Sequence, residues 1–328
     1  MAASRLGVPR WLHAKRQKRR DFRVFILEYH AVTPELEKEG AISAARFAEH
    51  LGWLKSRWRC VTVAQAASRL RARLDEDLVA ITFDDGYADN ARIAFPLLRE
   101  AELPATIYLA TGFLDGRELW FDLARRGLSE AEQDPKKAAG LDLVAKVVLG
   151  EVLGAWPTPL GLEEAMRRLK NAPPADRLAA TEALRPLAAS LPAKEPMTWA
   201  EARELLKHGI ELGAHTVDHP ILSKLGEGEQ EKQIAGSLER IEEELGERPR
   251  TFAMPNGSAR DYDATTLRLL AKLRIEAACT TRRGANADGC DLLQLRRIGV
   301  GSDSLAMLDA RLAGFFDEGV RRVFSRSA

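Results

Sequence analysis

Short apolar segments of strand length recur along this chain and alternate with segments of helical periodicity. Within each apolar segment, hydrophobic residues occupy successive positions, which is typical of strands buried on both faces of a parallel sheet. The expected strands lie at residues 24–29, 78–83, 104–110, 210–214, 251–254 and 276–280. Strands that alternate with helices in this way favour a parallel barrel or a doubly wound sheet, so we expect an α/β fold.

Helical patterns occupy the stretches between these strands. Ser43 is an expected N-cap because an apolar helical pattern follows it, and Thr198 with Glu201 forms an expected capping box. The expected helices cover residues 43–54, 88–102, 198–208, 227–245, 261–273 and 303–313. The connections between successive strands are therefore helical, as parallel pairing requires.

Residues 115–195 interrupt this alternation. They contain helical stretches at 162–169 and 177–187, and a structureless loop of this length is rare inside a compact domain. We expect one domain over residues 24–328, in which about 250 residues form a barrel and residues 115–195 form a mostly helical insertion. No apolar run of the chain reaches the ~18–20 residues that a membrane-spanning helix needs.

The charge of the chain is unevenly distributed. Residues 1–23 carry eight Lys and Arg residues against Asp21 alone, and the whole chain has a net charge of +1, so a segment of +7 precedes a body of −6. A mildly acidic body argues against a nucleic-acid-binding domain, and we expect no nucleic-acid partner. We expect the basic segment 1–23 to be a flexible terminus, with contact to an anionic membrane surface as the alternative.

The cysteines and the first residues bear on the cellular compartment. Cys60, Cys279 and Cys290 are too far apart in sequence for a CxxC metal site, and an odd, low count is typical of reduced thiols. The first residues contain no apolar stretch of the kind found in a secretion signal. Both features predict a cytoplasmic protein, peripheral to the inner membrane leaflet if residues 1–23 bind lipid.

Three polar motifs directly follow expected strands. The first, Thr82-Phe-Asp-Asp-Gly-Tyr87, places two carboxylates side by side, so that one can ligate a cation while the other takes a proton from a water that the cation activates. The second, His215-Thr-Val-Asp-His219-Pro220, has two imidazoles that can meet one metal ion. The third, Phe252-Ala-Met-Pro-Asn-Gly257, can aim a backbone N–H at an oxyanion. Taken singly, the first and third motifs also fit plain turns.

The three motifs are expected to converge, because all strands of a parallel barrel end on one face. One carboxylate and two imidazoles leave positions open for water, as in a catalytic metal site. In this order and combination, TFDDGY, HTVDHP and FAMPNG resemble the polysaccharide deacetylase family, the carbohydrate esterases that share the NodB homology domain. The likeness spans about residues 24–300, apart from the insertion.

The resemblance implies a distorted (β/α) barrel of about seven parallel strands and metal-dependent removal of N-acetyl groups from a sugar, a polysaccharide or a lipid-linked sugar. Asp84 resembles the catalytic base of the family, and Asp85, His215 and His219 resemble its metal ligands. The backbone N–H of Asn256 resembles the oxyanion donor. This donor set suits one divalent ion, for which we expect zinc, with cobalt, nickel or iron as alternatives.

The chain departs from the family pattern in its supply of a general acid. Many relatives use a His near the carboxyl terminus, whereas this chain has no His after His219. His30 follows the first strand and belongs to the same rim, which makes it our candidate for the general acid. The alternative is a hydrogen-bonded His that positions the first loop or contacts substrate.

A second departure concerns the partner of the base. Ala253 stands where many relatives have an Arg that orients it, and Arg296 or Arg297 would replace that Arg by pairing with Asp84, unless both are surface charges. Aromatic residues at the start of the insertion, among them Phe121, are candidates for stacking on a sugar ring or for the core of the insertion. The residues expected to contact substrate are Tyr29, Tyr87, Trp120 and Arg297.

The sequence leaves three functions open. The first is the metal-dependent deacetylase described above. The second is a non-catalytic glycan-binding or assembly partner, which the missing late His suggests. The third is a deformylase or another amidase with the same chemistry, because specificity depends on loops and on the insertion.

Overall fold

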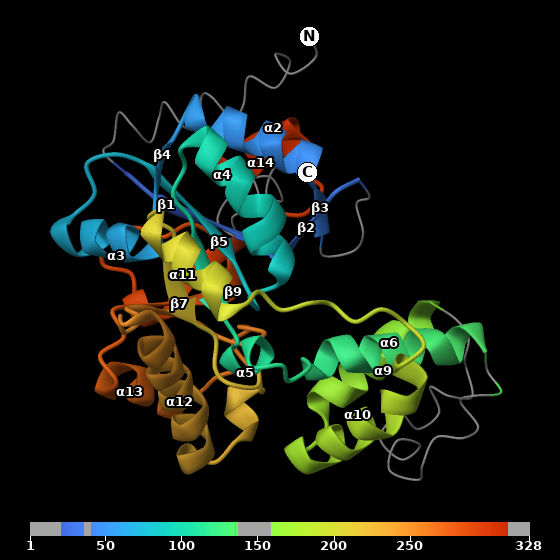
Figure 1. Cartoon of the computed structure of the whole chain (residues 1–328). Helices are drawn as coiled ribbons and strands as arrows, with labels where there is room; N and C mark the ends of the chain where they lie inside the picture. The colour runs from blue at the N-terminus through green and yellow to red at the C-terminus, as the bar shows by residue number, and fades with distance from the viewer. Residues whose placement is uncertain (1–20, 36–40, 135, 137–158, 314–328) are drawn as a thin grey trace, which may run out of the picture.

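Seven parallel strands close into a barrel at the centre of the fold (Figure 1). A computed structural model describes residues 21–35, 41–134, 136 and 159–313. The barrel strands follow one another in chain order, and the last pairs with the first to close the ring. They are β1 (Val24–Tyr29), β5 (Leu78–Phe83), β6 (Thr106–Leu109), β7 (Glu211–Ala214), β8 (Thr251–Ala253), β9 (Ala277–Arg283) and β10 (Leu295–Gly299). This confirms the predicted (β/α) barrel.

Six of the seven barrel strands lie where the sequence predicts strands, whereas β10 matches no expected strand. Arg296 and Arg297 interrupt its apolar pattern, which explains why the pattern misses it. Three shorter strands lie outside the ring. β4 (Arg59–Val61) pairs with β5, and β2 (Ala31–Thr33) pairs with β3 (Ala41–Ser43).

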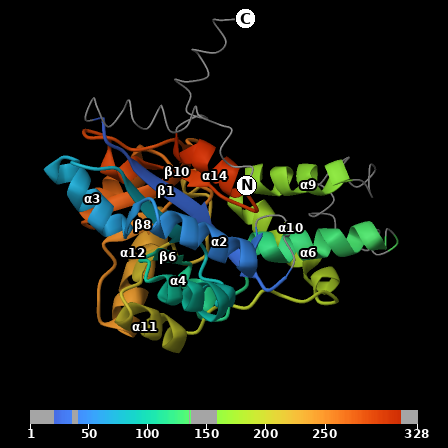
Figure 2. The same ribbon diagram turned by 90° about the horizontal axis from the view of Figure 1, so that it is seen from above.

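Helices surround the barrel in the layer between strands and solvent (Figure 2). Their ends follow the predicted caps: Ser43 accepts a hydrogen bond from the Arg46 N–H, and Thr198 with Glu201 forms a capping box. The expected helix 88–102 is present, with a π-helical segment, Asn90–Ala94, that continues into an α-helix. The helices are α2 (Ala44–Lys55), α3 (Val63–Ala72), α4 (Phe95–Ala101), α5 (Thr111–Leu114), α11 (Trp199–Lys207), α12 (Glu227–Leu245), α13 (Ala264–Lys272) and α14 (Leu305–Leu312).

Successive residues of the barrel strands alternate between the barrel interior and the surrounding helices. In β1, Val24 and Ile26 pack inside the barrel, whereas Phe25, Leu27 and Tyr29 pack in the outer layer. Helix α3 packs against the interior cluster and covers the amino-terminal end of the barrel. The carboxyl-terminal end is therefore the end where the barrel interior can open to solvent.

The described part of the insertion is helical. Helices α6 (Trp120–Gln133), α9 (Pro159–Asn171) and α10 (Pro174–Ala188) lie together to one side of the barrel in both views (Figures 1 and 2). They share a hydrophobic cluster of their own, which includes Leu123, Leu169 and Leu184. These helices therefore have a hydrophobic core separate from that of the barrel.

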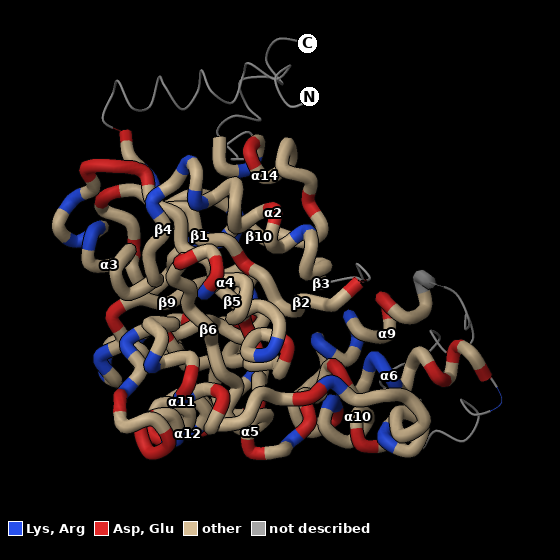
Figure 3. The backbone as a smooth tube through the Cα atoms, turned by 45° about the horizontal axis from the view of Figure 1, so that its top comes forward, with Lys and Arg blue, Asp and Glu red and all other residues tan. Residues whose placement is uncertain are grey.

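Charged residues of both signs are interspersed over the described backbone (Figure 3). Many form ion pairs, such as Arg240 with Asp115 and Arg250 with Glu276. Among the described residues, no helix is both long and apolar enough to span a membrane. The basic residues predicted to form a flexible or membrane-binding segment lie, up to residue 20, outside the described residues.

Candidate active site

A pocket of about 410 Å³ opens at the carboxyl-terminal end of the barrel. It brings together all six residues to which the sequence assigns catalytic or metal-binding roles, although they come from four separate segments. The residues that line it are Glu28, His30, Asp84, Asp85, Phe121, His215, His219, Asn256 and Thr281.

Asp85, His215 and His219 point their donor atoms at one another. The Asp85 Oδ1 lies 3.6 Å from the His215 Nε2 and 3.5 Å from the His219 Nε2. Donors that are ~2.0–2.2 Å from a tetrahedral ion lie about 3.3–3.6 Å apart, so the three atoms fit around one ion. All three side chains are buried, so the protein would shield an ion bound between them from solvent.

The hydrogen bonds around this cluster suit a metal site. His215 Nδ1 lies 2.8 Å from the Ala253 carbonyl oxygen, so Nδ1 carries the proton and Nε2 keeps its lone pair for a metal. The Asp85 Oδ1 is buried and has no hydrogen-bond partner in the part of the chain that the structure describes. A buried acceptor without a partner is costly, and a bound cation would remove that cost.

The electrostatics of the cluster suit a site that binds a cation. Burial raises the pKa of the Asp85 carboxyl. Burial, followed by the charge of His215, lowers the pKa of His219 well below its usual value. Both shifts arise because a buried site disfavours charged groups. A divalent ion would lower the pKa of Asp85 again and would keep the His219 imidazole neutral.

Unusual backbone conformations are concentrated in the loops of this site. Asp85, Thr216, His219 and Asn256 have φ angles of 75°, 66°, 53° and 59°, in the left-handed region that most residues avoid. Such conformations cost free energy and persist where the surrounding structure enforces them, which is common at functional sites. The sequence pattern carries no signal for them.

The second carboxylate of the pair, Asp84, has a different partner. Its Oδ1 and Oδ2 accept hydrogen bonds of 2.7 and 2.6 Å from the two terminal nitrogens of Arg297. Arg297 is fully buried and also lies 3.2 Å from the Glu28 Oε1. Burial alone would raise the pKa of Asp84, but the charge of Arg297 holds the pKa of that carboxyl well below its usual range. Arg297, and not Arg296, therefore takes the place left by Ala253.

A second group of donor atoms, from Glu28, His30 and Asp84, lies within 4.8 Å of one another. We do not assign a metal to it, because the Arg297 guanidinium already contacts both carboxylates and occupies both oxygens of Asp84. Glu28 instead links Arg297 to His30, because its Oε1 lies 3.2 Å from Arg297 and 3.9 Å from the His30 Nε2.

His30 is exposed at the pocket, and the loop that carries it is fastened by two neighbouring side chains. The Asn90 Nδ2 donates to the His30 carbonyl oxygen at 2.9 Å, and the Asp89 Oδ1 accepts from the Val32 N–H at 3.1 Å. These bonds fix the backbone of His30 while leaving its imidazole free to face a substrate.

We expect Asp89→Asn to stabilise the fold more at about pH 8 than at about pH 5. Burial raises the pKa of Asp89 from 3.8 to about 6, so the folded chain binds this proton more tightly than the unfolded chain. The stabilising effect of the proton is complete below 3.8 and is lost as the pH rises through about 6. Melting temperatures across this pH range, with the exposed Asp75→Asn as control, test the prediction. A gap between variant and wild type that does not change with pH would contradict it.

Asn256 contributes donors to the same pocket. Its Nδ2 is buried without a hydrogen-bond partner, and among the described residues its backbone N–H donates to no other group. Thr281, which also lines the pocket, holds the loop in place because its hydroxyl donates to the Asn256 carbonyl oxygen at 2.7 Å. The loop thus brings to the pocket N–H groups without a partner among the described residues, the kind of donor that an oxyanion needs.

The residues predicted to contact substrate are not among those that line the pocket. Tyr29 points into the outer layer, where its hydroxyl lies 3.1 Å from the His50 Nδ1, because strand alternation puts it on the opposite face from Glu28. Tyr87 is buried and donates to Asp122. Arg297 is also buried, and its guanidinium is committed to Asp84 and Glu28.

Trp120 does not line the pocket, whereas its neighbour Phe121 does. The Trp120 Nε1 donates to the His219 carbonyl oxygen at 3.0 Å. Sequence reasoning also missed Glu28, although its spacing of two residues from His30 on an extended strand places both on one face. That spacing is a signal that could have identified it.

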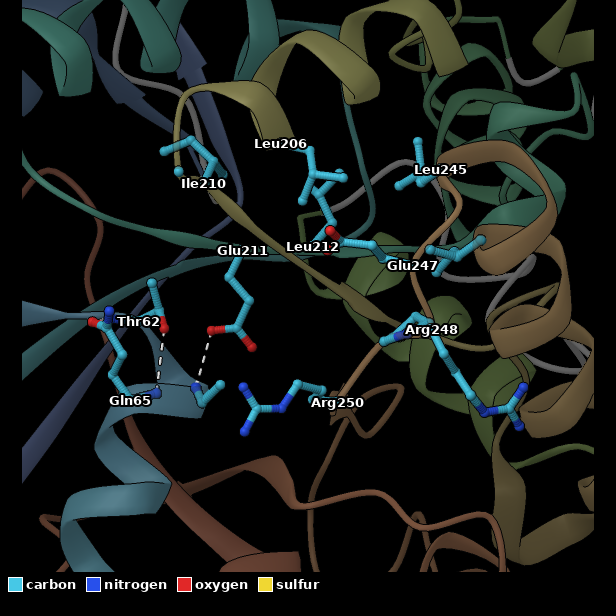
Figure 4. Close-up of a pocket in the computed structure, with 14 residues that line it drawn as sticks. Thr62, Gln65, Leu206, Ile210, Glu211, Leu212, Leu245, Glu247, Arg248 and Arg250 are labelled. Atoms are coloured by element: carbon cyan, nitrogen blue, oxygen red, sulfur yellow. Dashed lines mark hydrogen bonds between the residues drawn. The ribbon is translucent and has the colours of Figure 1, made fainter.

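A second hollow, of about 290 Å³, opens at the amino-terminal end of the barrel (Figure 4). Its half-buried acid, Glu211, is held within the fold, because it accepts hydrogen bonds from the Ala64 N–H and from the Thr106 and Thr251 hydroxyls. Arg250 at its edge pairs with Glu276. This hollow holds none of the residues with predicted roles.

The barrel and the donor groups on its rim place this chain among hydrolytic (β/α) barrels. The family profile described as Polysaccharide deacetylase matches residues 71–139 and 175–278, more than half of the chain. The chain therefore belongs to the polysaccharide deacetylase family, whose members are hydrolases that act on carbon–nitrogen bonds. The stretch between the two matched ranges lies inside the insertion, so this part is not shared with the family core.

Individual relatives agree with this assignment. YxkH of Bacillus subtilis (strain 168), which is named after this family, is 21% identical over 278 residues, covering 84% of this chain and 70% of YxkH. The deacetylase PplD of Streptococcus pyogenes, solved with acetate, has a TM-score of 0.59 and 18% identity, covering 88% of this chain and 96% of PplD. IcaB from Ammonifex degensii has a TM-score of 0.59 and 22% identity, covering 89% and 97% of the two chains. At these identities the solved structures show a shared fold.

Proposed function

We propose that this chain removes acetyl groups from N-acetylated sugars or glycans, with one divalent ion held by Asp85, His215 and His219. The family supports the substrate class, and PplD, a relative in fold, was solved with acetate. Zinc is the ion that we propose, because a carboxylate and two imidazoles form a donor set that zinc commonly accepts in open sites. When bound there, the ion supplies Lewis-acid polarisation of the acetyl carbonyl and makes a neighbouring water more acidic.

The residues of the chain supply the proton transfers. Asp84, ionised and fixed at both oxygens by Arg297, accepts a proton from the attacking water. The Asn256 N–H donates to the oxyanion that forms as the carbonyl carbon becomes tetrahedral. His30 then protonates the departing nitrogen, because an amide anion is a very poor leaving group.

One observation carries this proposal: two adjacent carboxylates have different environments. Asp84 is held by an arginine, whereas Asp85 faces two imidazoles at 3.5 and 3.6 Å and has an otherwise unpartnered oxygen. The first arrangement keeps a base ionised and oriented, and the second leaves a ligand available for a cation. The chain has no His near its carboxyl terminus, which suggested a non-catalytic partner. In this proposal His30, which lines the same pocket, supplies the general acid instead.

The products of the reaction test this function. We expect the zinc-loaded chain to release acetate and free amine in equal amounts from an oligomer of N-acetylglucosamine, because hydrolysis of one amide bond yields one of each. Acetate is measured by a coupled enzymatic assay and the amine by a fluorogenic reagent. The matched control is His215→Ala, which should lose both products together with its zinc.

The same assay separates the alternatives. Release of formate from N-formyl substrates, with no acetate from any acetylated sugar, would replace this function by deformylation. Binding of the oligomer without either product would support the non-catalytic reading and would contradict the proposal.

A further inference from the structure

The first turn of helix α6, where the insertion begins, packs directly on a proposed metal ligand. The Trp120 indole N–H donates to the His219 carbonyl oxygen at 3.0 Å. The Phe121 ring lies against the His219 imidazole, with ring centroids 4.8 Å apart and planes at 61°. His219 is thus held at its backbone and at its ring by two successive residues of the insertion.

The third residue of this turn, Asp122, reaches the other metal-binding segment. It is buried, and its Oδ2 accepts a hydrogen bond of 2.8 Å from the hydroxyl of Tyr87, two residues beyond Asp85. The buried Tyr87 therefore connects the insertion to the turn that carries Asp85.

The residues that end the insertion return to the same turn. Residues 194–197 run antiparallel to residues 86–88: the Ala88 N–H donates to the Glu195 carbonyl oxygen, and the Met197 N–H donates to the Gly86 carbonyl oxygen, both at 2.9 Å. Lys194 connects the end of the insertion to its start, because its Nζ lies 3.1 Å from the Asp122 Oδ1 and 3.2 Å from the Tyr87 hydroxyl.

Both ends of the insertion therefore hold the turn after β5. That turn needs support, because Asp85, which is not a glycine, has a φ angle of 75°. Gly86, at a φ that most other residues avoid, offers no side chain to anchor the turn. The support comes from the insertion.

We propose that Asp122 is a positioning residue of the metal centre: through Tyr87 it orients Asp85, and through Lys194 it joins the two ends of the insertion. The inference rests on the proposed function, because it concerns the same metal site. It assigns the insertion a part in metal binding. A purely structural role of the insertion would affect stability but not metal affinity. Because coupling of two binding events is reciprocal, the metal should in turn hold the insertion against the barrel.

Metal affinity is the property that tests this role. Substitutions of groups that orient metal ligands typically weaken metal binding about 10- to 100-fold, and we expect a loss of this size for Asp122→Asn and for Tyr87→Phe. The double variant should have the same zinc affinity as the single variant with the lower affinity, because both substitutions break the same connection. Affinity is measured by competition with a chromophoric zinc chelator, on the full chain.

The matched control is Glu118→Gln, also an acid-to-amide change in the insertion. Glu118 joins the start of α6 to α10 through Arg126 and Arg185 and touches no proposed metal ligand. We expect it to lower the melting temperature but not the zinc affinity. A second readout is proteolysis: zinc should slow cleavage within the insertion of the wild type and of Glu118→Gln, but not of Asp122→Asn.

The possible outcomes separate this inference from the function on which it rests. A wild type that binds no zinc would contradict the metal site and the function. A wild type that binds zinc tightly, with Asp122→Asn and Tyr87→Phe binding it equally well, would overturn the positioning role and leave the function intact. If Asp122→Asn does not fold, Tyr87→Phe, which removes one oxygen atom and keeps the ring, decides the result.

Discussion

Replacement of Asp84 by Asn is expected to lower kcat for acetate release by roughly 10²- to 10⁴-fold, because an amide cannot accept the proton of the attacking water. The variant keeps the size of the side chain and an oxygen that can still accept from Arg297. Zinc affinity should change little, because the ligand set consists of Asp85 and the two histidines. Kinetics and zinc titration on the same preparation check both parts.

The matched control for this variant is Glu28→Gln. Glu28 also contacts Arg297, at 3.2 Å, but takes no proton in the proposed reaction. If the loss in Asp84→Asn came from disturbing Arg297, both variants would lose activity to a similar extent. Equal losses, or full activity in Asp84→Asn, would contradict the assignment of Asp84 as the base.

Replacement of Arg297 by Met is expected to destabilise the fold by about 3–5 kcal/mol, because it leaves the buried carboxylates of Asp84 and Glu28 without their cation. For a chain of this size, that loss corresponds to a fall in melting temperature of roughly 10 °C. The loss should grow as the pH rises, because unpaired buried carboxylates bind protons more tightly in the folded chain and fold best when protonated. Thermal denaturation of the metal-free chain at about pH 5 and pH 8 measures both effects.

Arg296→Met is the matched control, because Arg296, the neighbour of Arg297 on β10, is partly exposed, and its guanidinium donates, among the described residues, only to the Arg283 carbonyl oxygen at 3.3 Å. It should have little effect on stability at either pH. Arg297→Lys keeps the charge but cannot bind both oxygens of Asp84 at once, so an intermediate loss is expected. A melting temperature unchanged in Arg297→Met would show that the buried network contributes nothing to stability.

The sequence was sufficient to bring the active-site residues together because each motif directly follows a strand. Strands of a parallel barrel end on one face, so Asp84, Asp85, His215 and Asn256 converge whatever the length of chain between them. The same argument placed His30 on this rim, and the structure puts it in the pocket. Local signals combined with one topological rule therefore located the site.

Residue-level errors arose where strand alternation was not applied. On β1, Tyr29 faces the helices while Glu28 faces the barrel interior, and the sequence argument chose the wrong one. On β10, Leu295 packs inside the barrel, so the period of two would have selected Arg297 over Arg296 as the partner of Asp84. The sequence argument had left both arginines open because it had not identified β10 as a strand.

Other features of the site have no local signal at all. The left-handed backbone at Asp85 and His219 is enforced by contacts from distant segments, including the bonds that Tyr87 and Trp120 make with partners far along the chain. The choice of Phe121 over Trp120 as the pocket wall also depends on how α6 docks against the barrel. These contacts depend on tertiary packing, which no spacing rule in a single sequence encodes.

Titration of the metal-free chain with zinc, with acetate release from an N-acetylglucosamine oligomer as the readout, tests the central claim most directly. The account predicts no activity without metal, a rate that rises with each addition of zinc, and a plateau at one equivalent per chain that Asp85→Asn does not reach. Acetate release by the metal-free chain at the rate of the zinc-loaded chain, or no acetate at any zinc concentration, would contradict it.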